Sequence, residues 1–188
     1  IFTHDNKLYS FSMKYLKLKY ILILLAFFIS NLSYSSDQLD IKNLVINDSP
    51  IKYTDVTFKN IQNKQVIVEN LKGQLVILNF WAIWCKPCRE EMKSLDLLQS
   101  NKELKNIKIF PINVGNDNVK KSKDFFKELD IKFLDIYFDE KLSLTKKFSL
   151  RGIPTTIILN KKGEEFARII GAIDFNDQVF IDWIKKYD

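Results

Sequence analysis

Cysteine and histidine are scarce in this chain, and their scarcity excludes several kinds of site. The 188 residues contain two cysteines, Cys85 and Cys88, and one histidine, His4. A structural zinc site takes about four ligands, usually cysteine and histidine, and these residues do not supply them. Covalent haem attachment needs a histidine directly after a Cys-x-x-Cys pair, where this chain has Arg89. We therefore expect no metal centre.

The excess of basic over acidic residues is also small. The formal net charge is +6, and residues 1–35 carry four lysines and one aspartate, which leaves a net charge of +3 for the remainder. So small a surplus does not make the basic surface that nucleic acids require. Because His4 lies in the same N-terminal stretch, residues 36–188 have no histidine for Cys–His or Ser–His catalysis.

The N-terminal stretch has the pattern of an export signal. Met13 opens a lysine-rich segment, residues 20–29 are an apolar run, and Ser33 and Ser35 supply small side chains at alternate positions, as a cleavage site does. The apolar run is shorter than the roughly 20 residues of a membrane-spanning helix. We predict that residues 13–35 are a signal peptide cleaved near Ser35 and that residues 1–12 are an upstream segment or a start-site error. An uncleaved membrane anchor is the alternative.

The two cysteines lie where a strand pattern gives way to a helix pattern. Residues 75–78 are a short apolar run followed by aromatic residues, which is typical of a buried strand. Met92, Leu95 and Leu98 then recur at the spacing of one helix face. We therefore place Cys85 and Cys88 at a strand-to-helix junction, on the first turn of the helix.

The start of a helix favours the thiolate form of a cysteine. Unpaired backbone N–H groups and the summed peptide dipoles make it partly positive, which lowers thiol pKa values from about 8.5 toward 7 or below. Cys85 precedes the helix and is expected to attack, whereas Cys88 is expected to resolve the mixed disulfide. Pro87 suits the first turn, where no N–H is needed, and Lys86 adds positive charge. An inert structural disulfide is the alternative.

The remaining periodicity alternates strands with helices. Strands are predicted at residues 51–58, 65–68, 106–114, 133–138, 155–159 and 164–170, and helices at 117–129, 141–148 and 176–186. We expect Val119 on the buried face of its helix, and Val179 and Tyr187 on the buried side of the last helix. Pro111 leaves a bulge or an early end of its strand open. The alternation predicts an α/β domain whose mixed sheet is covered by helices on both faces.

Two motifs together resemble the thioredoxin superfamily. Residues 80–88, Phe-Trp-Ala-Ile-Trp-Cys-Lys-Pro-Cys, are similar to its active-site strand and helix, and residues 151–156, Arg-Gly-Ile-Pro-Thr-Thr, to the loop that carries its cis-proline. The layout of residues 39–187 resembles the TlpA/ResA branch of exported thiol–disulfide reductases. This resemblance implies a thioredoxin fold over residues 36–188, with an N-terminal hairpin and a strand-helix insertion before the cis-proline loop.

The resemblance also implies roles for residues around the sulfurs. Glu91 matches a functional glutamate of ResA-type proteins, and we expect it to accept the proton of Cys88 with a pKa that burial raises. By the same match, the Ile153–Pro154 bond is cis, faces Cys85 and lies beside backbone that can pair with an extended client segment. The residues assigned to client binding are Trp84, Lys86, Pro87, Ile153 and Pro154.

Two residues depart from the family pattern. Asn79 occupies the position where ordinary thioredoxins have a buried aspartate, and an amide forms hydrogen bonds but does not take a proton. The proton is therefore left to Glu91 or to water. Lys93 stands where many relatives have a helix-kinking proline, which leaves the bend of this helix open.

These expectations combine into a periplasmic thiol–disulfide oxidoreductase that reduces protein disulfides through Cys85 and Cys88 without a cofactor. The resemblance implies disulfide-bearing exported clients, with apocytochrome c suggested among them, and a membrane thiol protein as electron donor. Three alternatives stay open. They are a disulfide oxidase, because direction follows the reduction potential, a peroxiredoxin-like peroxidase, and a non-catalytic binding module of the same fold.

Overall fold

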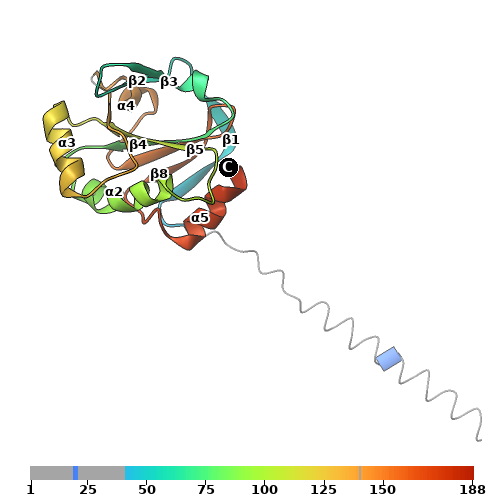
Figure 1. Cartoon of the computed structure of the whole chain (residues 1–188). Coiled ribbons are helices and arrows are strands. Elements are labelled where there is room, and N and C mark those ends of the chain that lie inside the picture. Colours follow the sequence, from blue (N-terminus) through green and yellow to red (C-terminus); the bar gives the residue numbers. More distant parts are fainter. Residues whose placement is uncertain (1–18, 21–40, 140) are drawn as a thin grey trace, which may run out of the picture. The chain divides into compact units, whose positions relative to one another are not determined.

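The computed structural model describes residues 19–20, 41–139 and 141–188. The predicted upstream segment and signal peptide lie outside the described residues, except for Lys19 and Tyr20, and so do residues 36–40. The predicted domain bounds therefore stay predictions. Residues Asp40–Asp188 form one unit by their contacts, and its strands and helices are coloured along the chain in Figure 1.

One mixed sheet organises this unit. In the described residues its eight strands lie in the order β1–β8–β7–β4–β5–β6–β2–β3. They are β1 (Leu44–Lys52), β2 (Thr57–Asn60), β3 (Gln65–Ile67), β4 (Leu75–Trp81), β5 (Ile107–Asn113), β6 (Tyr137–Phe138), β7 (Thr155–Leu159) and β8 (Glu164–Ile170). β4 pairs parallel with β5 and antiparallel with β7.

Helices cover the sheet on both faces (Figure 1). They are the α-helices α2 (Lys86–Gln99), α3 (Val119–Glu128), α4 (Ser143–Lys147) and α5 (Gln178–Ile184), and the 3-10 helices η1 (Val68–Leu71) and η2 (Lys185–Tyr187). Core residues of α2, α3 and α5 pack with Leu75, Ile77 and Trp81 of β4, whereas those of α4 and η1 pack with Val76, Leu78 and Phe80. Successive residues of a strand face opposite sides of the sheet. Both faces of β4 are buried, which accounts for its continuous run of apolar residues, interrupted only by Asn79.

The predicted fold class is confirmed. β2 and β3 form the N-terminal hairpin, with antiparallel pairing from Thr57 with Ile67 to Lys59 with Gln65. β6 and α4 form the insertion that precedes the proline loop and β7. β7 and β8 keep the predicted bounds, since a tight turn with Gly163 at a φ of 82° joins them.

The sequence pattern does not predict β1, and the predicted strand at residues 51–58 is wrong in its bounds. β1 ends at Lys52, and β2 begins only at Thr57. β1 pairs antiparallel with β8 at the edge of the sheet, with a register shift between Ile46 and Ile51. Most of its side chains are exposed, so it lacks the alternation that marks a half-buried strand.

Asp96 explains why β6 is shorter than the strand predicted at residues 133–138. Its buried carboxylate, on α2, accepts the backbone N–H groups of Lys132, Phe133 and Leu134 at distances between 2.7 and 3.2 Å. Because these N–H groups bond to a side chain of the helix, only the two residues after Ile136 join the sheet.

Pro111 neither ends β5 nor makes a bulge in it. The register of β5 with β4 runs unbroken from Ile107 to Asn113. On its other side, β5 pairs with β6 only from Ile112 onward, so the ladder on that side begins beyond the residue that has no N–H to donate.

Three residues predicted in the core lie at the surface. Val119 is 36% exposed, Val179 is 50% exposed and Tyr187 is 38% exposed. Tyr187 lies in η2, beyond the end of α5. Each of the two valines lies in the first turn of its helix, and the buried stripe begins later. In α3 it consists of Ser122, Phe125 and Phe126. In α5 it consists of Phe180, Ile181, Trp183 and Ile184.

Candidate active site

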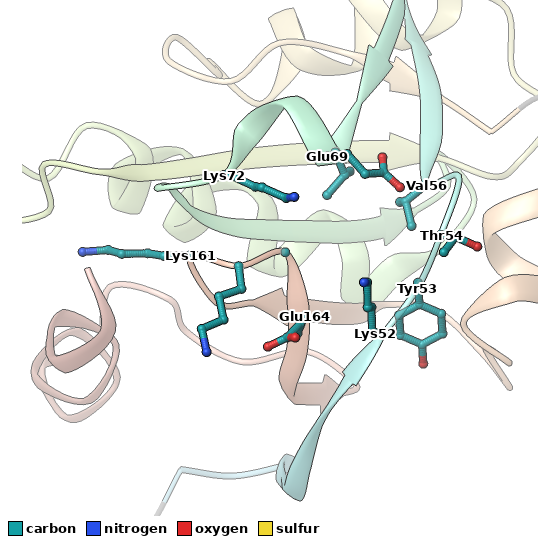
Figure 2. Close-up of a pocket in the computed structure, with 11 residues that line it drawn as sticks. Lys52, Tyr53, Thr54, Val56, Glu69, Lys72, Lys161 and Glu164 are labelled. Carbon is teal, nitrogen blue, oxygen red and sulfur yellow. The ribbon is translucent and has the colours of Figure 1, made fainter.

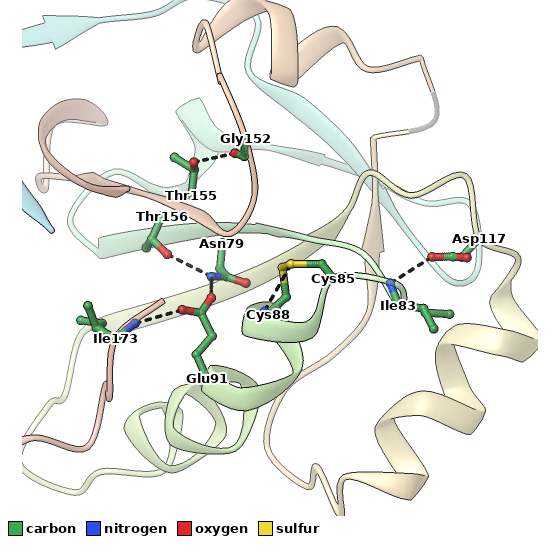
Figure 3. Close-up of a disulfide and its surroundings, with 10 residues drawn as sticks. All are labelled: Asn79, Ile83, Cys85, Cys88, Glu91, Asp117, Gly152, Thr155, Thr156 and Ile173. Carbon is green, nitrogen blue, oxygen red and sulfur yellow. Dashed lines mark hydrogen bonds between the residues drawn. A yellow bond between two sulfur atoms is a disulfide. The ribbon is translucent and has the colours of Figure 1, made fainter. Parts of the chain in front are cut away.

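The two sulfurs lie at the junction between β4 and α2. Cys85 is the N-cap residue of α2, and its Sγ accepts the backbone N–H of Cys88 at 3.3 Å. Cys85 and Cys88 form a disulfide (Figure 3). Cys85 keeps 4% of its surface exposed, whereas Cys88 is fully buried. An approaching client can therefore reach only Cys85.

The start of α2 directs a backbone N–H at the Cys85 sulfur, whereas the thiolate form of Cys85 stays a prediction. Pro87 lies in the first turn, where no N–H is needed for helix bonding. The N–H of Cys88 is aimed at the Cys85 sulfur, and a hydrogen bond from a helix N-terminus favours the charged form of a sulfur. Lys86 lies 3.9 Å from Glu90, with both side chains largely exposed. Solvent screens this pair, so Lys86 adds little to the effect.

Glu91 is buried beside the sulfurs. It lies three residues after Cys88 on α2 and is 2% exposed. Its Oε1 accepts a hydrogen bond from Asn79 Nδ2 at 2.8 Å, and its Oε2 accepts one from the backbone N–H of Ile173 at 3.3 Å. Burial raises the pKa of Glu91 to about 8, although both hydrogen bonds act in the opposite direction. The carboxyl group is therefore able to exchange a proton near neutral pH.

A groove of about 620 Å³ connects Glu91 to the surface on the side of α2. It lies between α2 and the segment that follows β8, and its lining includes Ser94, Leu97 and Ile173. Glu91 is among the residues that line this groove, so the groove reaches the part of α2 that holds the buried carboxyl group.

The proline loop lies next to the cysteine pair. The Ile153–Pro154 peptide bond is cis, and Pro154 is buried. The following residue, Thr155, pairs with Phe80 of β4. Ile153 is half-buried and packs against the core cluster that contains Cys85 and Cys88. The structure thus brings the second motif to the end of β4 where the first motif begins.

Three of the residues assigned to client binding flank Cys85 or Cys88 in the chain, and the other two lie on the proline loop. Trp84 is 71% exposed, and Lys86 and Pro87 are also exposed. Ile153 lies on the proline loop and packs, half-buried, against the core cluster that contains both cysteines. The role of these five residues in client binding stays a prediction.

Sequence reasoning missed a clamp on the active-site turn. The Asp117 carboxylate accepts the backbone N–H of Ile83 at 3.3 Å and Asn113 Nδ2 at 3.0 Å. Gly115 lets this loop approach closely, because a Cβ there would lie 2.7 Å from the Cβ of Ala82 and 3.2 Å from Nε1 of Trp84. One signal was available, since β5 runs parallel to β4 and its carboxyl end meets the active-site turn.

Another pocket, of about 530 Å³, contains none of the predicted site residues (Figure 2). It lies between the end of β1, η1 and the β7–β8 turn. Its charged lining residues are Lys52, Glu69, Lys72, Lys161, Lys162 and Glu164. Its lining mixes charges of both signs, and neither cysteine of the chain lies in it.

Metal and membrane features can be stated for the described part of the chain alone. There, no group of three or more histidine, cysteine, aspartate or glutamate residues is arranged to hold a metal ion. Over the same residues, none of the helices combines the length and the apolar character needed to cross a bilayer.

Sequence comparison relates the chain to thiol–disulfide oxidoreductases. The thiol-disulfide oxidoreductase ResA of Bacillus cereus is 30% identical over 112 residues, which cover 60% of this chain and 64% of that protein. The sporulation thiol-disulfide oxidoreductase A of Bacillus subtilis is 33% identical over 108 residues, or 56% of this chain and 64% of that protein. The chain thus spans somewhat less than two thirds of the length of the curated relatives it matches.

Structural comparison agrees with the sequence. The crystal structure of StoA from Bacillus subtilis matches with a TM-score of 0.57 at 29% identity, over 70% of this chain and 94% of that chain. A secreted thiol-disulfide isomerase from Corynebacterium glutamicum shares the fold, with a TM-score of 0.62 at 22% identity, over 73% of this chain and 88% of that one. The model of the AhpC/TSA family matches residues 51–164. The chain therefore belongs to the AhpC/TSA family and has that family's thioredoxin-like fold.

Proposed function

We propose that this chain is a thiol–disulfide oxidoreductase that reduces the disulfides of exported proteins. One observation carries the proposal. The Cys85–Cys88 disulfide caps the start of α2, only Cys85 reaches the surface, and the buried carboxyl group of Glu91 lies one turn beyond Cys88. This arrangement supplies an attacking sulfur, a resolving sulfur and a proton acceptor in one place.

In the reducing direction, the Cys85 thiolate attacks one sulfur of the client disulfide. A Cys85–client bond forms, and the other client sulfur leaves as a thiolate and takes a proton from water. The ionised carboxylate of Glu91 then accepts the proton of the Cys88 thiol, and the Cys88 thiolate attacks the Cys85 sulfur. The Cys85–Cys88 bond forms, and the client's second sulfur leaves as a thiolate. Two electrons have passed from the protein to the client.

The surroundings of Glu91 support its role as proton acceptor. With a pKa of about 8, its carboxyl group is mainly protonated at neutral pH when the cysteines are oxidised. This is the state in which the exchange leaves it. The groove beside α2 would allow the proton to escape to solvent without crossing the surface around Trp84 where the client binds.

The geometry favours a client whose disulfide lies in an extended or unfolded segment. Only 4% of Cys85 is exposed, so a sulfur held in a rigid, flat surface would not reach it. An extended segment could pair with backbone beside Ile153 and Pro154 while its side chains contact Trp84. Apocytochrome c is the suggested client, because its cysteines must be reduced before haem attaches.

The proposed location is the periplasm, where a membrane thiol protein would supply electrons. The export pattern at residues 13–35 supports this location. An oxidising compartment would leave a Cys-x-x-Cys pair as a disulfide unless a donor reduces it. An uncleaved leader would tether the domain to the membrane, facing the same compartment.

Equilibration with glutathione buffers tests the direction of the reaction. We expect a reduction potential below about −200 mV, nearer to the −270 mV of thioredoxin than to the −120 mV of a strong oxidant. A potential near the oxidant value would overturn the reductase assignment in favour of a disulfide oxidase.

A separate experiment distinguishes catalysis from binding. If the Cys85→Ser, Cys88→Ser double variant rescues a client as well as the wild type does, the protein is a non-catalytic binding module.

A further inference from the structure

Asn79 is the hydrogen-bond partner of the proposed proton acceptor, Glu91. It is fully buried in β4. Its Nδ2 donates to Glu91 Oε1 at 2.8 Å and to Thr156 Oγ1 at 2.9 Å. Both hydrogens of the amide are therefore used, and they fix the orientation of the side chain.

The carbonyl oxygen of the same side chain has no hydrogen-bond partner within the described chain. Asn79 Oδ1 is fully buried, and an unsatisfied buried acceptor costs about 1–3 kcal/mol. Figure 3 shows this oxygen on the side of Asn79 that is turned toward the Cys85–Cys88 disulfide. Cys88 precedes Glu91 by three residues on α2, so both side chains lie on the helix face toward which the Asn79 amide is directed.

The oxidised state leaves this oxygen without a donor for a chemical reason. A disulfide has no hydrogen to donate, whereas a thiol has one S–H. Reduction of the Cys85–Cys88 bond creates a buried thiol at Cys88, because the start of the helix favours the thiolate at Cys85 instead.

We propose that Asn79 is a positioning residue whose side-chain carbonyl accepts the S–H of Cys88 in the reduced protein. The inference rests on the proposed function, since it concerns the dithiol state of the same pair. Asn79 would then bind the Cys88 thiol through its side-chain oxygen and Glu91 through its side-chain nitrogen. One side chain would thus fix both the proton donor, Cys88, and the proton acceptor, Glu91. It would also stabilise the dithiol relative to the disulfide.

The first test detects the hydrogen bond itself. Cys85→Ala leaves Cys88 as the one thiol of the chain, and its S–H stretching band in the infrared moves to lower frequency when the thiol donates a hydrogen bond. We expect a low-frequency band in Cys85→Ala and a higher-frequency band when Asn79→Leu is added. An identical band position in both proteins would overturn the inference, because it would mean that something other than Asn79 faces the thiol.

The second test measures the consequence for the redox equilibrium. Asn79→Leu removes the carbonyl and is expected to make reduction by glutathione about tenfold less favourable, which lowers the potential by about 30 mV. Asn79→Ala removes the same carbonyl without bulk and is expected to act in the same direction. Thr156→Val is the matched control, because it removes the other partner of the amide and leaves Oδ1 in place. We expect it to stay within twofold of wild type.

Failure of the inference about Asn79 can be distinguished from failure of the proposed oxidoreductase function. An equilibrium constant within twofold of wild type in both Asn79 variants, or a shift toward easier reduction, would overturn the role of Asn79 alone. If instead the wild-type disulfide does not exchange with glutathione at all, the oxidoreductase proposal itself is wrong. Both tests use the purified full chain and need no client.

Discussion

Two adjacent glutamates on α2 have opposite environments, and the environment decides their chemistry. Glu90 is exposed and lies near Lys86. Glu91 is 2% exposed and bonds to Asn79 and the backbone of Ile173. Neighbouring helix residues point about 100° apart, so one turns to solvent and the other into the sheet. Burial raises the pKa of Glu91 to about 8, which suits proton transfer near neutral pH.

The raised pKa of Glu91 predicts a pH-dependent stability. The carboxyl group has a pKa of about 8 in the folded protein against 4.5 for the ordinary group. Between these values the folded state keeps a proton that the unfolded state releases, so stability falls as the pH rises. The wild-type protein should lose about 3 kcal/mol between about pH 5 and pH 8 from this group. Glu91→Gln should lack that loss, as measured by urea unfolding of the oxidised protein.

Glu90→Gln is the matched control for this prediction. It removes the same kind of carboxyl group from an exposed position on the same helix, so its unfolding free energy should follow the wild-type pH dependence. Parallel pH profiles for wild type and Glu91→Gln would contradict the assignment of a raised pKa to Glu91.

The sequence predicts the surroundings of a residue only where its contacts are with residues close to it in the chain. Glu91 could be placed beside Cys88 because three residues on a helix make neighbours. The bond between Asn79 and Glu91 joins a strand to a helix, and that between Asp117 and Ile83 spans 34 residues. Contacts of this kind depend on how the elements pack, which the sequence pattern does not specify.

At the scale of elements, the loop between β5 and α3 holds the active-site turn in place. Asp117 bonds to the turn at Ile83, and Gly115 lies against Ala82 and Trp84. The loop therefore supports the residues just before Cys85, and a change in it would act on the site from outside.

Gly115→Ala tests this support. The added Cβ would meet the Cβ of Ala82 and the carboxylate of Asp117, each at 2.7 Å, so the turn or the loop must shift. Overpacking of this kind should lower the free energy of unfolding by about 1–3 kcal/mol. Thiol–disulfide exchange should slow as well, because Trp84 and Cys85 are displaced.

Gly152→Ala is the comparison, since a Cβ there meets nothing within 4 Å. It should leave stability within about 1 kcal/mol of wild type, on the stabilising side, because it restricts the unfolded chain. Equal unfolding midpoints in urea for the two variants would contradict the close approach at Gly115.

The elements that the sequence predicted well are those with their own local signals. β7 and β8 have apolar runs and a glycine turn between them, and α2 has a regular apolar face. β1 and β6 were missed or misjudged because distant partners define them. β1 is an exposed strand that is defined by its pairing with β8 at the sheet edge. The strand expected before Tyr137 does not form there, because Asp96 accepts three of its backbone N–H groups.

At the scale of the whole domain, the sheet order brings two distant motifs to one edge. β7 pairs with β4, so the cis-proline loop before β7 lies beside the cysteine turn after β4. The same pairing places Thr156 against Asn79. The resemblance to the thioredoxin superfamily supplied this arrangement, whereas periodicity alone gave only an α/β domain.

The most direct measurement of the central claim is covalent trapping of a client by Cys88→Ser. Without the resolving thiol, the bond between Cys85 and a client sulfur cannot be released by Cys88. The account predicts disulfide-linked complexes through Cys85, identified by mass spectrometry after expression of the full chain, residues 13–35 included, and none with Cys85→Ser. Absence of complexes with Cys88→Ser, or equal amounts with both variants, would contradict it.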